Sequence, residues 1–157
     1  MTKIYTLIPI KFNSDRVPGK NFRLMNNKPL FYYIINNLKK CKYISKIIIN
    51  IDNEFLEESI KKYFDDVEFY YRPEYLKGGD VPTNKLLIDM IENMNLDADY
   101  YFQTHTTNPL LKLETINKAI NMFLNENKYC LCYDSLFSVK KWQTRLYDKN
   151  SNAVNHN

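Results

Sequence analysis

The chain has 157 residues and a net charge of +4, with apolar and charged fractions close to those of globular proteins. This length suits one domain with its own core, and the composition excludes a disordered or collagen-like chain. No apolar run is long enough to cross a bilayer, and early charges interrupt any signal-peptide pattern. We therefore expect a cytoplasmic protein that makes no membrane contact.

Apolar periodicity predicts strands and helices that alternate along the whole chain. In order, they are a strand at 3–10, a helix at 29–41, a strand at 44–51, a helix at 55–64, a strand at 67–71, a helix at 86–94, a strand at 100–103, a helix at 113–124 and a strand at 129–139. Such alternation is typical of an α/β, Rossmann-like layered domain with a mainly parallel sheet. We expect a single nucleotide-binding domain over residues 1–157. Its polar tail lacks a closing element, so the domain looks truncated at the C-terminus.

Positive charge gathers near the start of the chain. Residues 1–28 contain six lysines and arginines but only one acid, Asp15, whereas the remainder is nearly neutral. A nucleic-acid-binding domain usually spreads its basic residues over a face or along a helix. The clustering favours a small polyanion as ligand, and we expect no nucleic-acid partner.

The loop after the first expected strand is rich in hydrogen-bond donors. It contains Lys11, Ser14, Arg16, Lys20 and Asn21. In open α/β sheets, ligands bind beyond the carboxyl ends of the strands, and arginine and lysine together suit the oxygens of a polyphosphate. The loop matches neither the Walker A nor the dinucleotide-binding glycine pattern. It is therefore either a solvated basic segment or a polyphosphate site of another kind.

The three glycines of the chain fall in two loops of this class. Gly19 follows the first expected strand, and Gly78 and Gly79 follow the third. Glycine allows backbone conformations and close approaches that other residues resist. The positions indicate either ordinary turns or places where the backbone approaches a ligand.

Several blocks resemble the acylneuraminate cytidylyltransferases, the enzymes that make CMP-sialic acid and related compounds. The opening IPIKFNSDRVPGKN, followed by KPLFYYIINNL, is similar to the family's first loop and helix start. The blocks at 72–76 (RPEYL), 102–111 (FQTHTTNPLL) and 134–139 (DSLFSV) occur in the family's order. The resemblance implies a fold of the nucleotide-diphospho-sugar transferase type and covers nearly the whole chain, as the N-terminal part of a longer enzyme.

The resemblance implies a reaction in which the hydroxyl of a sialic-acid-like sugar acid attacks the α-phosphorus of CTP and pyrophosphate leaves. It gives Lys20 and Arg16 the catalytic task of holding the triphosphate and stabilising the leaving group. The remaining assignments are nucleotide binding by Lys11, Ser14, Asn21, Arg72 and the backbone at Ile10, and sugar-acid binding by Gln103. Mg²⁺ is the expected cofactor, bridging phosphate oxygens. This chemistry does not need His105, which we expect to be structural or loop-facing.

The chain also departs from the family pattern. Phe12 and Asn13 replace a usual glycine pair, so more of the phosphate binding should fall to side chains. The family's metal-binding aspartates and dimerisation segment lie in a C-terminal part without a match here, so neither Asp134 nor Asp148 is assigned as a metal ligand. A homodimer is possible although its usual segment is absent. The alternative function is that of a non-catalytic nucleotide-binding or regulatory relative.

Overall fold

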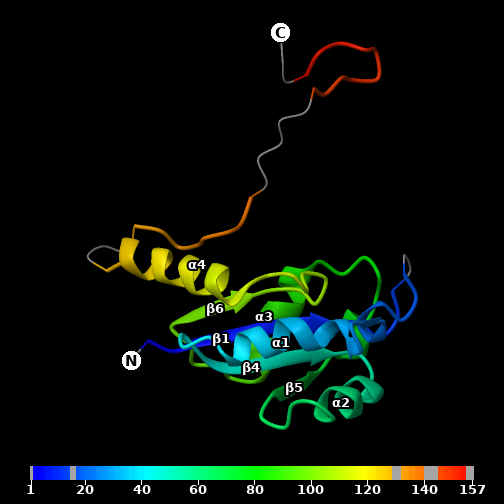
Figure 1. Ribbon diagram of the computed structural model, residues 1–157, viewed down its shortest axis with the longest axis vertical. Coiled ribbons are helices and arrows are strands. Elements are labelled where there is room, and N and C mark those ends of the chain that lie inside the picture. Colours follow the sequence, from blue (N-terminus) through cyan, green and yellow to red (C-terminus); the bar gives the residue numbers. More distant parts are fainter. Residues whose placement is uncertain (1, 15–16, 129–131, 140–144, 155–157) are drawn as a thin grey trace. The chain divides into compact units, whose positions relative to one another are not determined.

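The computed structural model describes residues 2–14, 17–128, 132–139 and 145–154 (Figure 1). The chain divides into two compact units, Met1–Met122 and Phe123–Asn157. None of the helices in the described residues is long and apolar enough to cross a membrane. The expectation of a single nucleotide-binding domain over residues 1–157 stays a prediction. A division into compact units does not show whether each unit folds independently.

A four-stranded parallel sheet forms the centre of the first unit. Its strands are β1 (Ile4–Ile10), β4 (Ile44–Ile51), β5 (Glu68–Tyr71) and β6 (Tyr100–Gln103), in the order β5-β4-β1-β6. In the centre of the sheet, Leu7 pairs with Ile48 on one side and with Gln103 on the other. β1 and β4 are buried on both faces, because helices cover both sides of a parallel sheet.

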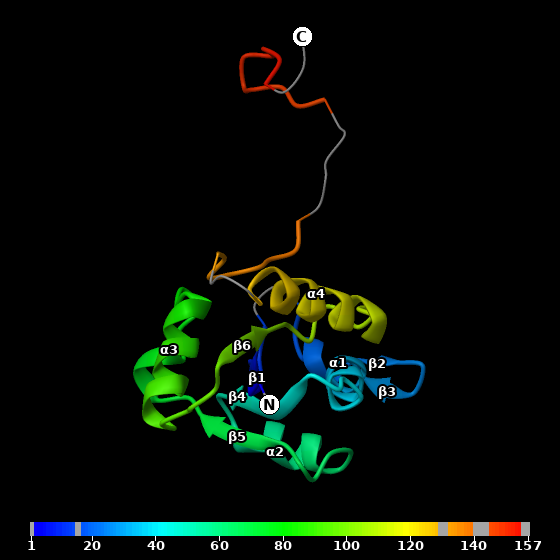
Figure 2. The same ribbon diagram turned by 90° about the vertical axis from the view of Figure 1, so that its left-hand side faces the viewer.

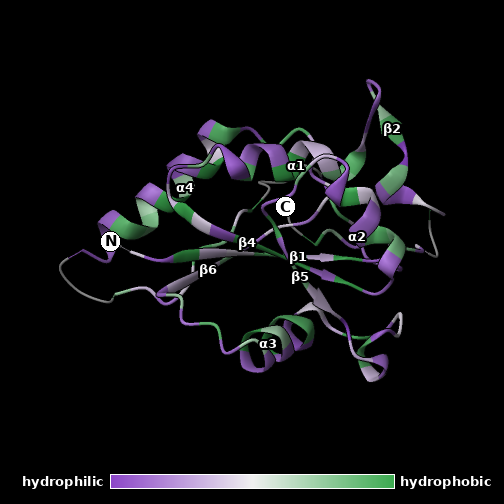
Figure 3. Cartoon of the chain, turned by 90° about the horizontal axis from the view of Figure 1, so that it is seen from below, coloured by the Kyte–Doolittle hydropathy of each residue, from purple (hydrophilic) through white to green (hydrophobic). Residues whose placement is uncertain are grey.

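Helices form the two outer layers. They are α1 (Leu30–Lys39), α2 (Glu54–Lys61), α3 (Thr83–Asn93) and α4 (Leu113–Glu126), with short 3₁₀ helices η1 (Lys20–Phe22) and η2 (Glu74–Leu76). α1, α2 and the part of α4 up to Met122 lie on one face, and α3 lies on the other (Figures 2 and 3). On the α3 side, Met90 packs with Tyr5, Leu7 and Ile48 in one cluster. The helices carry both hydrophilic and hydrophobic residues, as amphipathic helices of an outer layer do (Figure 3).

Local signals explain several element ends. Asn53 caps α2 by accepting a hydrogen bond from the Phe55 N–H at 2.8 Å. A small hairpin, β2 (Leu24–Met25) with β3 (Lys28–Pro29), turns at Asn26 and Asn27, which both have positive φ. Asparagine tolerates that conformation better than most residues. The sequence patterns did not reveal this hairpin, because its strands have two residues each.

The predicted α/β fold with a parallel sheet is confirmed, and its first four strands and four helices are all present. The strand expected at 129–139 is wrong for the part that the structure describes, since residues 132–139 contain no strand. Phe137 and Val139 are about four-fifths exposed (78% and 81%). A strand forms only when its backbone pairs with a neighbour. Phe137 and Val139 lie in no strand, although their apolar side chains favour one.

Candidate functional site

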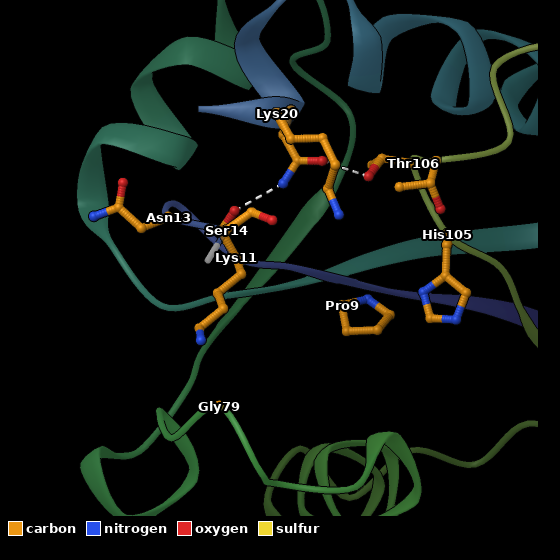
Figure 4. A pocket seen from close by; sticks show the side chains of 10 residues that line it. Pro9, Lys11, Asn13, Ser14, Lys20, Gly79, His105 and Thr106 are labelled. Carbon is orange, nitrogen blue, oxygen red and sulfur yellow. Dashed lines mark hydrogen bonds between the residues drawn. The ribbon is translucent and has the colours of Figure 1, made fainter. Parts of the chain in front are cut away.

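The sheet reverses its strand order beside β1. After β1 the chain adds β4 and β5 on one side and then returns to place β6 on the other. Ligands of open α/β sheets bind at such a point, beyond the carboxyl ends of the strands. A cavity of about 430 Å³ opens there (Figure 4). The described residues that line it are Pro9, Lys11, Asn13, Ser14, Lys20, Asn21, Gly79, His105, Thr106 and Thr107.

Asn21 joins two walls of this cavity. Its Nδ2 donates to the Lys11 carbonyl at 2.7 Å, and its Oδ1 accepts a hydrogen bond from the Thr106 hydroxyl at 2.6 Å (Figure 4). Asn21 is 3% exposed and Thr106 4% exposed, so water competes little for these bonds. The side chain thereby ties the loop after β1 to the loop after β6.

Two further features fix the loop after β1. Gly19 has a φ of +61° just before η1, a left-handed conformation that glycine adopts without strain. The Phe12 N–H donates to Asp52 Oδ1 at 2.8 Å, and the Phe12 ring packs edge-on against Phe22 and Phe55 at centroid distances of 5.5 and 5.6 Å. The backbone at Phe12 is therefore anchored, and the next two residues, Asn13 and Ser14, belong to the cavity lining.

The cavity suits an anion. Lys11, Lys20 and His105 are the groups in its described lining that can carry charge, and no carboxylate is among them. Loss of hydration around the His105 imidazole, together with the nearby Lys20 ammonium, lowers the pKa of His105 below its ordinary value. The other lining side chains are mostly amides and hydroxyls, which can donate hydrogen bonds to phosphate oxygens.

Arg72 is buried and is not part of the described cavity lining. It is 6% exposed, its Nε donates to Asn50 Oδ1 at 2.8 Å, and its Nη2 donates to the Ile10 carbonyl at 3.3 Å. Burial lowers the pKa of Arg72, and Asp52 opposes that shift. Arg72 therefore binds together the carboxyl ends of β1 and β4.

The structure brings together some of the predicted site residues. Lys11, Ser14, Lys20 and Asn21 line the cavity, whereas Ile10, Arg72 and Gln103 are not in its described lining. Gln103 ends β6, and its Nε2 lies 3.0 Å from His105 Nε2. Arg16 lies outside the described residues. Contact of any of these residues with a nucleotide stays a prediction.

Sequence reasoning missed the wall that follows β6. His105, which we expected to be structural or loop-facing, lines the cavity with Thr106 and Thr107. The strand-end rule, applied to the fourth expected strand as it was to the first, points to these positions. Gly79 also lines the cavity. The sequence allowed either an ordinary turn or a close approach to a ligand at this glycine.

The described cavity lining contains no carboxylate that could bind Mg²⁺. Mg²⁺ is usually bound through one or two carboxylates. Nowhere in the described part of the chain do three or more His, Cys, Asp or Glu residues cluster in a way that could hold a metal ion. We therefore derive no chemical step through a protein-bound metal.

Comparison with known proteins finds relatives that are named as cytidylyltransferases or as synthases of CMP-linked sugar acids. The profile of a family described as cytidylyltransferase matches residues 5–157. The chain is 25% identical over 155 residues to CMP-N,N'-diacetyllegionaminic acid synthase of Legionella pneumophila, covering 97% of this chain and 66% of that protein. It is 26% identical over 128 residues to pseudaminic acid cytidylyltransferase of Campylobacter jejuni, covering 78% and 54%. The chain thus spans less than two thirds of the length of either relative.

Solved structures share the fold. A CMP:2-keto-3-deoxy-manno-octonic acid synthetase complexed with CTP matches with a TM-score of 0.67 at 13% identity, over 81% of this chain and 49% of that one. A cytidylyltransferase from Leptospira borgpetersenii matches with a TM-score of 0.64 at 18% identity, over 81% and 51%. At these identities the likeness establishes the fold alone.

Proposed function

The chain belongs to the cytidylyltransferase family, and on this premise we propose that it binds CTP at the carboxyl ends of β1 and β6. We propose further that it is the nucleotide-binding part of an enzyme that joins CMP to a sialic-acid-like sugar acid. The observation that carries the proposal is the cavity at the strand-order reversal, whose described lining offers lysines, amides and hydroxyls but no carboxylate. Two relatives named for legionaminic and pseudaminic acid support a sugar acid as the second substrate.

The proposed reaction needs positioning and charge more than a nucleophilic side chain. The sugar-acid hydroxyl forms a new bond to the α-phosphorus of CTP while the bond from that phosphorus to the pyrophosphate oxygen breaks. Negative charge then develops on the leaving pyrophosphate, and fixed cations lower the barrier. Lys20 and Arg16 have this role in the proposal, and Lys11 and Ser14 support them.

Other residues act through position. Asn21 uses its amide to hold Lys11 and Thr106 in place, so it keeps the two cavity walls at the correct spacing. In the proposal, the backbone at Ile10 reads the cytosine edge, and Arg72, which donates to the Ile10 carbonyl, lies near the base or ribose. Gln103 faces the sugar acid from the end of β6.

Thermal unfolding with added nucleotides tests the proposal. A ligand at about 100 times its Kd adds about 2.7 kcal/mol to the free energy of unfolding. For a chain of this size that corresponds to a rise in Tm of roughly 5–10 °C. We expect such a rise with CTP and a much smaller one with UTP or ATP. Equal rises with all three nucleotides contradict a cavity that reads cytosine.

A matched pair of lysine variants locates the site. Lys20→Ala should abolish the CTP-induced rise, because it removes a cavity cation. Lys40→Ala removes the same charge at the exposed end of α1, at the opposite edge of the sheet, and should leave the rise intact. If both variants respond to CTP like the wild type, the phosphate-binding loop is wrongly assigned.

A second candidate function is nucleotide binding without catalysis. It is favoured by the described cavity lining, which offers no carboxylate to a catalytic metal. Release of pyrophosphate from CTP in the presence of sialic-acid-like sugar acids distinguishes the two. CTP binding without pyrophosphate release supports the non-catalytic function for this chain.

A further inference from the structure

His105 lines the cavity from the loop after β6, together with two lysines. Lys20 faces it from η1, and Lys11 lines the same cavity from the loop after β1 (Figure 4). The loop between β5 and α3 contributes the backbone of Gly79, which brings no charge. No carboxylate in the described lining offsets the lysines. Among the charged groups of the described lining, a proton on His105 therefore meets only positive neighbours while the cavity holds no anion.

The hydrogen bond from Gln103 fits a neutral imidazole. Gln103 Nε2 lies 3.0 Å from His105 Nε2, and an amide nitrogen can donate but not accept. The ring nitrogen is then the acceptor, which places the ring proton on Nδ1. Partial loss of hydration and the Lys20 ammonium lower the pKa of His105, in agreement with that neutral form.

A bound triphosphate reverses this electrostatic balance. Its negative charge neutralises the field of Lys20 and Lys11, and an imidazolium next to a phosphate oxygen donates a charge-assisted hydrogen bond. We propose that His105 is a third cationic ligand of the polyphosphate, and that it takes one proton from solvent when the nucleotide binds. Gln103 then gives up its bond to the ring and keeps the Thr104 carbonyl, 3.4 Å from its Nε2, as an acceptor. This inference rests on the proposed binding of CTP in the cavity.

Calorimetry measures the proton directly. The heat of CTP binding at about pH 7, in buffers that differ in protonation enthalpy, gives the number of protons taken up. We expect the wild type to take up more protons than His105→Gln, by an amount between about a half and one. The γ-phosphate of CTP also titrates near pH 6, so the difference in uptake between the two proteins, rather than the uptake of either one, reports on His105. His156→Gln removes the only other histidine of the chain and serves as the matched control, with uptake equal to the wild type.

The pH dependence of affinity gives a second expectation. In the pH range between the pKa of His105 in the free chain and its pKa in the complex, CTP binding should weaken as the pH rises. For each pH unit, the wild type should lose up to about tenfold more affinity than His105→Gln loses. If that variant fails to fold, an NMR titration of the wild-type histidine rings replaces it, with His156→Gln used to assign the signals. CTP should then raise the pKa of His105.

The outcomes separate the two proposals. CTP binding with equal proton uptake in the wild type and His105→Gln refutes the inference and leaves the proposed function standing. An NMR pKa of His105 that CTP leaves unchanged or lowers refutes it in the same way. A wild-type chain that gives no binding heat with CTP refutes both.

Discussion

The hydrogen bond between Asn21 and Thr106 joins two walls of the cavity, and its strength can be measured with a double-mutant cycle. Thr106→Val keeps the side-chain volume but leaves the buried Asn21 Oδ1 without its donor, which should lower the free energy of unfolding by about 1–3 kcal/mol. Asn21→Ala leaves the buried Thr106 hydroxyl without its acceptor and the half-buried Lys11 carbonyl without its donor. We expect it to cost about 2–4 kcal/mol.

The double variant should be no less stable than Asn21→Ala alone. Thr106→Val destabilises by leaving Asn21 Oδ1 without a donor, and Asn21→Ala has already removed that oxygen. The coupling energy is then about 1–3 kcal/mol. Urea unfolding followed by circular dichroism measures all four proteins, and equal m-values show that the compared states are alike. Thr107→Val is the control, since Thr107 is exposed and should change stability by less than about 0.5 kcal/mol. Additive losses, with a coupling energy near zero, would refute the bridge between the walls.

Three more predictions test the site and its support. Arg72→Met keeps much of the side-chain length but removes the donors to Asn50 and Ile10, so the free energy of unfolding should fall by about 2–4 kcal/mol in urea; an unchanged value contradicts the buried role. Mg²⁺ alone should give no binding heat by calorimetry, because the described cavity lining lacks carboxylates, and should bind when CTP is present; tight binding without nucleotide contradicts this. A hydrogen bond from Lys3 and a smaller effect of one from Tyr5 lower the pKa of Asp97 in the folded protein. The ionised Asp97 therefore stabilises the fold at any pH above its unfolded pKa of about 3.9. This stabilisation is lost as the pH falls through the lower pKa of the folded state. Asp97→Asn should therefore be less stable than the wild type near neutral pH and equally stable in strong acid, and a stability gap that persists in strong acid contradicts the assigned pKa shift.

Much of the sheet could be predicted because its residues leave few alternatives. A run such as Ile44–Ile51, in which five of the eight residues are isoleucine, suits a strand covered on both faces. The same reasoning placed a strand at 129–139 and failed at 132–139, since composition reports a preference for extended backbone but not whether a partner strand is at hand. Pairing is a long-range property, and no local pattern encodes it.

The site was predictable on one wall only. Lys11 and Lys20 could be found because they are charged, close in sequence and directly after a buried strand. Thr106 carries no such signal, since its role depends on the position of Asn21, which is 85 residues earlier in the chain. Arg72 shows the converse. The family resemblance indicated a nucleotide contact, which stays a prediction, and the fold adds burial and two internal acceptors that give this side chain a structural role as well.

Phe12 shows how the first loop of this chain can be held without the glycine pair that the family resemblance leads one to expect there. A glycine-rich loop binds phosphate through its backbone, but its flexibility must be lost on binding. Here the Phe12 ring contacts Phe22 and Phe55, which also contact each other at 5.5 Å, and each such aromatic pair contributes about 0.5–1.5 kcal/mol beyond simple burial. The backbone at Phe12 is thus held before any ligand arrives, and the described lining of the cavity includes the side chains of Lys11 and Lys20. A chain built in this way should depend more on Lys11 and Lys20 for affinity than a relative with the glycine pair does.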